Sequence, residues 1–168
     1  MSLLVDRGSG RCIATNSWRT TEAMHASAEQ VTPMHKRAAQ ILDGAPIDNF
    51  WQIAVMHRDH TSGPGACVRA TWLKARPEQF ARAIDFYRSE VLPATQEFDG
   101  FCSASLLVDP TAARAVASVT YDTVAAMERS ADATGSLRTA MLGDLGLDQD
   151  DTGEFELALA HLRVTEVP

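Results

Sequence analysis

Arg69 and Thr71 are the first candidates for a reaction site, because they bring polar chemistry into a stretch that alternates like a β-strand. Within residues 67–73, alternation places Arg69 and Thr71 on one side of the strand and Ala70 and Trp72 on the other. We expect helices to cover the apolar side, so that the polar pair faces an interior space. Arg69 would then either bind an anion or a phenolate, or lie at the rim of this space and pair with one of the acidic residues.

Two histidines, His57 and His161, occupy matching places near the ends of two expected strands. A histidine titrates near neutral pH, so it can act as a general base, and it is also a common haem ligand. Their repetition indicates either paired catalytic roles or common descent. In the second case, backbone carbonyls at each strand end hold the two rings.

Asn16 and Trp51, which lie within the expected strands at 11–18 and 50–58, join Thr71 as candidate substrate-binding residues. The competing interpretation for Trp51 is packing. In the internal repeat described next, Trp51 aligns with Phe155, as aromatic residues of two equivalent cores would.

These candidates lie in a passage that occurs twice in the chain. Residues 2–6, Ser-Leu-Leu-Val-Asp, recur as residues 105–109, an offset of 103. The same register continues without a gap through the pairs Arg11/Arg114, Ala14/Ala117, Thr20/Thr123, Ala23/Ala126, Met24/Met127, Ser27/Ser130 and Ala28/Ala131. The repeat predicts two related units that pack on each other.

The second copy supplies the elements of a complete unit. Its patterns predict strands at 67–73, 101–108, 114–121 and 155–163, a helix at 78–92 that Pro93 ends, and a helix at 123–145 with a break near Gly135. The order β-α-β-β-α-β is ferredoxin-like, an α+β arrangement with an antiparallel sheet and both helices on one face.

The first copy supplies only strands at 3–6, 11–18 and 50–58 and a helix at 21–42. We therefore expect an incomplete first repeat at 1–60, a linker at 61–66 and a complete second repeat at 67–168. Either the natural chain begins further upstream, or the partial copy is completed in another way. Its strands would pair directly, or they would borrow a strand from the second copy or from a second chain.

The sheet face away from the helices also carries apolar residues, including Val116, Leu157 and Leu159, so it needs a cover. A second sheet provides one. The sequence thus predicts two related units that form an α/β barrel, and a homodimer as the assembly.

Composition limits the classes of partner. The chain has 168 residues and a net charge of −7, which argues against nonspecific binding to nucleic acid or anionic membranes. No signal peptide or membrane span is visible, and Cys12, Cys67 and Cys102 form no CxxC or zinc pattern. We expect reduced packing thiols, a cytoplasmic location, and neither a metal nor another cofactor.

Several motifs point to a family. They are the helix end Glu90-Val91-Leu92-Pro93, the turn Asp99-Gly100-Phe101, the strands Leu106-Leu107-Val108-Asp109 and Val119-Thr120-Tyr121, and the strand end Ser17-Trp18-Arg19-Thr20 in the first copy. In these motifs the chain resembles antibiotic biosynthesis monooxygenase-type domains of the dimeric α/β barrel superfamily. That superfamily includes cofactor-free oxygenases acting on polycyclic phenols and haem-degrading enzymes.

The resemblance implies a small-molecule-binding barrel that acts as a metal-free monooxygenase on an aromatic or polyketide-like substrate. Arg69, His57 and His161 would then be the catalytic residues. Haem-degrading members carry an asparagine on the first strand, where this chain has Arg69 and Thr71, so it departs from their pattern. The alternative function is a non-catalytic ligand-binding or structural barrel.

Overall fold

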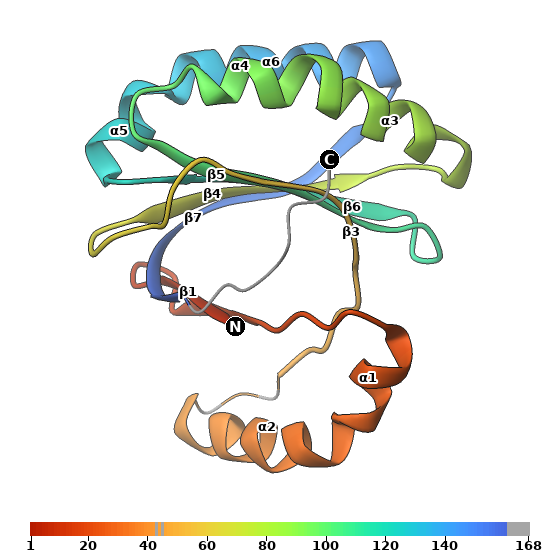
Figure 1. The fold of residues 1–168 in the computed structure, drawn as a ribbon, viewed down its shortest axis with the longest axis vertical. Coiled ribbons are helices and arrows are strands. Elements are labelled where there is room, and N and C mark those ends of the chain that lie inside the picture. The colour runs from red at the N-terminus through yellow and green to blue at the C-terminus, as the bar shows by residue number, and fades with distance from the viewer. Residues whose placement is uncertain (43, 45, 161–168) are drawn as a thin grey trace.

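The computed structural model describes residues 1–42, 44 and 46–160, and their strands form one antiparallel sheet in the order β2-β1-β7-β4-β6-β5-β3 (Figure 1). The strands are β1 (Ser2–Asp6), β2 (Arg11–Thr15), β3 (Gln52–Arg58), β4 (Cys67–Lys74), β5 (Phe101–Asp109), β6 (Arg114–Tyr121) and β7 (Asp148–Ala160). The helical elements are α1 (Thr21–Ala26), α2 (Ala28–Leu42), η1 (Pro77–Gln79), α3 (Phe80–Phe86), η2 (Tyr87–Val91), α4 (Leu92–Gln96), α5 (Val124–Arg129) and α6 (Ala131–Leu145).

Strands β7-β4-β6-β5 are adjacent in this order and have the helical segments of their connections on one face (Figure 1). The expected α+β class and the β-α-β-β-α-β order are therefore confirmed for this part of the chain. We call the helix-covered side the outer face. Its core packs strand residues such as Leu73 and Leu106 against Tyr87 and Met141 of the helices.

The opposite side is the inner face. Here Ala70, Val116 and Phe155 are buried, and Leu4 and Ile13 of β1 and β2 pack against them. Strand β7 makes this possible, because it bends away from the main sheet and carries β1 and β2 below it (Figure 1).

The helix between β4 and β5 does not end at Pro93, as the sequence suggested. It passes through the π-helical turn η2 and continues as α4 to Gln96. A π-turn shifts the hydrogen-bonding pattern by one residue, so the missing N–H and the ring of Pro93 are tolerated at the start of α4. The other long helix breaks at Ser130, whose hydroxyl donates to the carbonyl of Met127 at 2.8 Å, and not near Gly135.

Strand β7 begins seven residues earlier than predicted, at Asp148. Its N-terminal part is polar and pairs with β4, and its C-terminal part pairs with β1. Strand β3 pairs with β5 on the other side of the sheet. Residues 1–58 thus borrow strands from the later segment, while β2 and β3 end up at opposite ends of the described sheet.

The pairing of β1 with β7 and the pairing of β3 with β5 have the same register at equivalent residues of the repeat. Leu3 lies opposite Leu159 and Leu4 opposite Leu157, so that Ala158 is skipped. At the offsets of the repeat, Leu106 lies opposite Val55 and Leu107 opposite Ile53, and Ala54 is skipped. The same irregularity therefore occurs at two places that correspond in the repeated sequence.

The α1–α2 segment lies on the far side of β1 and β2 from the main helices (Figure 1). Its apolar side chains are little covered, with Met34 60% and Ile41 67% exposed. Cys12 on β2 is exposed as well, so the prediction of a packing thiol is wrong at this position. Its repeat partner Ala115 is buried in the core beneath the main helices.

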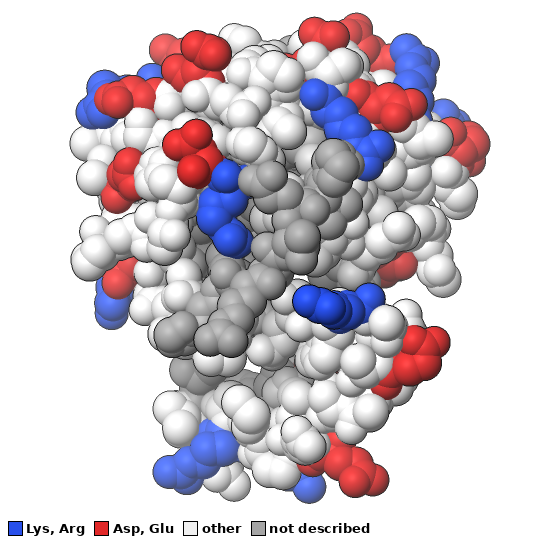
Figure 2. Space-filling view, in the orientation of Figure 1, with Lys and Arg blue, Asp and Glu red and all other residues white. Residues whose placement is uncertain are grey.

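Acidic and basic side chains are interspersed over the face shown in Figure 2. None of the described helices combines the length and apolar character that a bilayer span requires.

Candidate functional site

Arg69 projects toward the helices, so the predicted orientation into an interior space is wrong. Its guanidinium donates to Oε1 of Glu154 and to the carbonyl oxygen of Met127, both at 2.9 Å. Longer bonds reach Oγ of Ser130 at 3.3 Å and Oγ1 of Thr134 at 3.4 Å. With the residue only 8% exposed, this arginine ties β4 to the junction of α5 and α6.

The parity of the strand was predicted correctly and the face was assigned wrongly. The break at Ser130 leaves the carbonyl of Met127 above β4, and a buried carbonyl at a helix C-terminus favours a cationic donor. Thr71 shares this face with Arg69 and is also buried.

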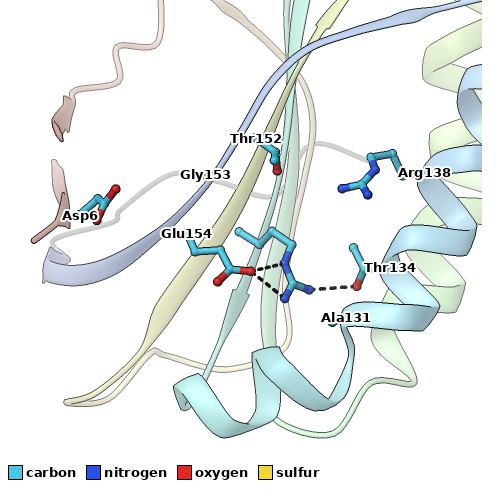
Figure 3. Close-up of a pocket in the computed structure, with 8 residues that line it drawn as sticks. Asp6, Ala131, Thr134, Arg138, Thr152, Gly153 and Glu154 are labelled. Atoms are coloured by element: carbon cyan, nitrogen blue, oxygen red, sulfur yellow. Dashed lines mark hydrogen bonds and ion pairs between the residues drawn. The ribbon is translucent and has the colours of Figure 1, made fainter. Parts of the chain in front are cut away.

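Arg69 borders an open pocket of about 650 Å³ at the β7 side of α6 (Figure 3). Charged and small polar residues line it: Asp6, Arg69, Ala131, Thr134, Arg138, Thr152, Gly153 and Glu154. In Figure 3, Glu154 lies across the pocket from Thr134. The pocket is polar and is built around an ion pair, which suits a structural role for Arg69.

Apart from Thr71, the predicted residues that the structure describes lie away from Arg69. His57 lies on β3, where its ring stacks on Phe101 at 6.2 Å and Nε2 is 2.8 Å from the amide nitrogen of Gln96. Strands β5 and β6 separate it from β4. His161 lies outside the described residues. Asn16 is exposed just after β2, and its substrate-binding role stays a prediction.

Among the predicted residues that lie in the described part of the chain, Trp51 is the one that the structure brings to the inner face. It is partly buried against Ala70, Val116 and Phe155, as is Trp72. Aromatic rings that are only partly covered provide a surface on which a planar ligand can stack.

Two arginines flank these rings. The guanidinium carbon of Arg11 lies 4.2 Å from the ring centroid of Trp72, and that of Arg114 lies 4.7 Å from the ring centroid of Trp51. Both arginines also hold carboxylates, Asp151 and Asp109 respectively. They lie on the strand that follows each hairpin turn, and these turns are on opposite sides of the molecule (Figure 1).

These carboxylates are held in the ionised form. The pKa of Asp109 is lowered, first by the backbone N–H of Ala112 and then by the guanidinium of Arg114. The pKa of Asp151 is lowered mainly by Arg11. At neutral pH, both ends of the inner face therefore carry an arginine with an ionised partner.

Hydroxyl pairs complete the inner face. Oγ of Ser105 and Oγ of Ser118 lie 2.7 Å apart on β5 and β6. The equivalent residues of the first copy, Ser2 and Thr15, also bond to each other through their hydroxyls. Together with the arginines, these hydroxyls offer hydrogen-bonding partners for the phenol and carbonyl groups of an aromatic ligand.

Sequence reasoning missed Arg11, Arg114, Trp72 and the hydroxyl pairs. A signal was present, because Arg11/Arg114 and Ser2/Ser105 are identical pairs in the repeat.

Comparison with known proteins gives both a fold and a family. No family model matches the chain. A crystal structure of an anthrone oxidase-like protein superposes with a TM-score of 0.66 at 12% identity, over 94% of this chain and 76% of that one, which shows a shared fold. The chain is 56% identical to the uncharacterized protein Rv2557 of Mycobacterium tuberculosis (strain ATCC 25618 / H37Rv), over 99% of this chain and 75% of that protein. It is 54% identical to Rv2558 of the same strain, over 99% of this chain and 71% of that protein. The chain belongs to the family of Rv2557 and Rv2558.

Proposed function

We propose that the protein binds an aromatic or polyketide-like small molecule on its inner face and oxidises it as a metal-free monooxygenase. One observation carries the proposal: partly covered tryptophans lie under arginines at both ends of the inner face, beside the buried Ala70, Val116 and Phe155. Tryptophan offers a stacking surface, and a guanidinium stabilises a phenolate by a charge-assisted hydrogen bond.

The shared fold with an anthrone oxidase-like protein suggests the reaction class. In an anthrone, a methylene flanked by aromatic rings is oxidised to a carbonyl. One oxygen atom of O2 enters the substrate, and the other leaves as water with the two methylene hydrogens. The substrate supplies all the electrons, so no reductant is required. The contribution of this chain is to hold the phenolate form, which is the more readily oxidised one.

A binding experiment tests the site directly. We expect a hydroxylated anthrone to quench the fluorescence of Trp51 and Trp72, and the exposed Trp18→Phe variant to bind it unchanged. Arg114→Gln should weaken binding about tenfold or more, since a charge-assisted hydrogen bond is worth roughly 1.5–3 kcal/mol. Equal affinity in Arg114→Gln and wild type would contradict the proposed site.

Oxygen consumption separates the enzyme from its alternative. A monooxygenase of this kind consumes O2 in proportion to the anthrone and incorporates labelled oxygen from O2 into the product. Tight binding without oxygen consumption would instead identify a non-catalytic ligand-binding barrel. The inner face supports that alternative too, because its carboxylates Asp109 and Asp151 are engaged by arginines and are poor bases at neutral pH.

The catalytic roles of Arg69, His57 and His161 and the binding roles of Thr71 and Asn16 stay predictions. The geometry supports Arg11 and Arg114 in their place. For Arg69, a stabilising role explains all of its contacts.

We also propose that residues 1–60 and 67–168 are related units, joined by the linker at 61–66, and that together they form an α/β barrel. The equivalent registers of β1 with β7 and of β3 with β5 support this. A homodimer would cover the edges of β2 and β3 and the exposed Met34 and Ile41. Light scattering during size-exclusion chromatography of the full chain tests it, and a monomer at micromolar concentration would contradict it. Free thiols support a cytoplasmic location.

A further inference from the structure

Outside the inner face, three side chains of different metal-binding types meet beside the start of α5. They are His60 in the loop after β3, Cys102 on β5 and Asp122 after β6. In Figure 1, the β3–β4 loop, the start of β5 and α5 lie at the same side of the molecule. Nε2 of His60 is 2.9 Å from Oδ1 of Asp122, and Sγ of Cys102 is 3.1 Å from the same oxygen.

We propose that His60, Cys102 and Asp122 bind a divalent transition-metal ion of the zinc class. The donor set of one imidazole nitrogen, one thiolate sulfur and one carboxylate oxygen is one that zinc uses. This site is independent of the proposed function of the inner face.

The geometry is close to what such an ion needs. Bond lengths of about 2.0–2.3 Å at tetrahedral angles separate the ligand atoms by about 3.5 Å. The three ligand atoms all lie within 4.8 Å of one another, and the two shortest separations need to widen by only about half an ångström. The side chains of His60 and Asp122 are 40% and 45% exposed, which leaves a side open to a water or a further ligand.

A second observation supports the assignment. Nδ1 of His60 is 2.9 Å from Oδ2 of Asp59, so this carboxylate fixes the ring with Nε2 directed at the other two ligands. A carboxylate that holds the distal nitrogen of a histidine is the usual outer-shell partner in zinc sites. The backbone N–H groups of Asp59 and His60 also point to the carbonyl oxygen of Cys102, at 2.9 and 3.4 Å, which fixes the loop beside the thiol.

The sequence did not reveal this cluster, because its members are far apart along the chain and show no ligand spacing. The sequence predicts only a packing role for Cys102 and places His60 at the end of the first repeat. The pairing of β3 with β5 brings the loop to the thiol, and the pairing of β5 with β6 brings Asp122 to it.

Cobalt titration of the untagged, metal-free full chain tests the site, because cobalt reports its ligands by absorption. We expect one equivalent of Co2+ to give a thiolate-to-cobalt charge-transfer band and the visible bands of a tetrahedral ion, and Zn2+ to remove both. Cys102→Ser should abolish the charge-transfer band. The matched control is Cys67→Ser, which changes a similarly buried thiol on strand β4, separated from β5 by β6, and should leave the band intact.

Two variants in the loop after β3 test the same site if Cys102→Ser does not fold. His60→Gln should weaken cobalt binding at least a hundredfold, and Asp59→Asn should weaken it about 10–100-fold as the loss of an outer-shell partner. Absence of the charge-transfer band in the wild type would overturn the proposal. So would a band that persists in Cys102→Ser, or cobalt affinity that is equal in His60→Gln and wild type.

Discussion

Replacing Arg69 tests whether this residue serves the scaffold or a reaction. We expect Arg69→Met to lower the free energy of unfolding by about 2–4 kcal/mol, because bonds from a charged donor contribute roughly 1.5–3 kcal/mol each. Methionine keeps most of the aliphatic volume, so the loss reports on the guanidinium and not on a cavity.

Two contacts around Arg69 keep the expected loss in free energy of unfolding small. The side chain of Glu154 is 53% exposed and returns to water when its partner is removed, so its ion pair contributes little. The hydroxyl of Ser130 still donates to the carbonyl of Met127 in the variant. Arg69→Lys should cost less than Arg69→Met, since the ammonium keeps the charge but cannot reach all four acceptors.

Urea denaturation measures the effect. With a slope of about 2 kcal/mol per molar urea, the midpoint should fall by about 1–2 M in Arg69→Met. The control is Arg138→Ala, which removes another arginine of the same pocket and should change stability by less than about 0.5 kcal/mol. A midpoint within about 0.2 M of the wild type in Arg69→Met would refute the structural role.

Three further predictions follow from local geometry. Gly100 has φ +70°, and a Cβ added there would lie 2.7 Å from a side chain of α5, so Gly100→Ala should lower the free energy of unfolding by about 2–4 kcal/mol in denaturation. Gly10 has φ +75° but lies in open space, so Gly10→Ala should lower it by only about 1–2 kcal/mol. In the native, metal-free protein, Ellman's reagent should label Cys12 rapidly and the two buried thiols only on unfolding; three fast thiols would contradict the burial. Because bonds from the backbone N–H of Ala112 and from the guanidinium of Arg114 lower the pKa of Asp109 in the folded state, the ionised carboxylate stabilises the protein above its unfolded pKa, and this contribution is lost as the pH falls through the folded pKa. Asp109→Asn should therefore show a smaller loss of stability on acidification than the wild type, and identical acid profiles would disprove the coupling.

The sequence was most informative where apolar periodicity and the repeat agreed. Strands β4, β5 and β6 were found to within a residue, because each has one face in the core and ends at a turn. Strand β7 was found only in its apolar second half. Its first half has the composition of a loop and becomes a strand because β4 offers an unpaired edge, which is a tertiary effect.

The candidate site was harder to predict because alternation identifies two sides of a strand but not which one is covered. For β4, the polar side was placed in the interior on the assumption that helices cover apolar residues. The helices instead cover Arg69, since their junction presents a carbonyl and two hydroxyls that pair with it. Such polar partners come from residues about 60 positions away, and no local pattern encodes them.

The free energy needed to break existing bonds of the guanidinium favours the inner-face arginines, Arg11 and Arg114, over Arg69 as ligand-binding residues. An anionic ligand must draw a guanidinium away from its existing partners. Arg69 would have to give up buried bonds to Met127 and the hydroxyls around it, which weakens the junction of α5 and α6. Arg114 has a side chain that is 36% exposed, and its partners, Asp109 on the same hairpin and Asn49 before β3, lie away from the junction of α5 and α6. A phenolate stacked on Trp51 can therefore replace that carboxylate at low cost, while the fold stays intact.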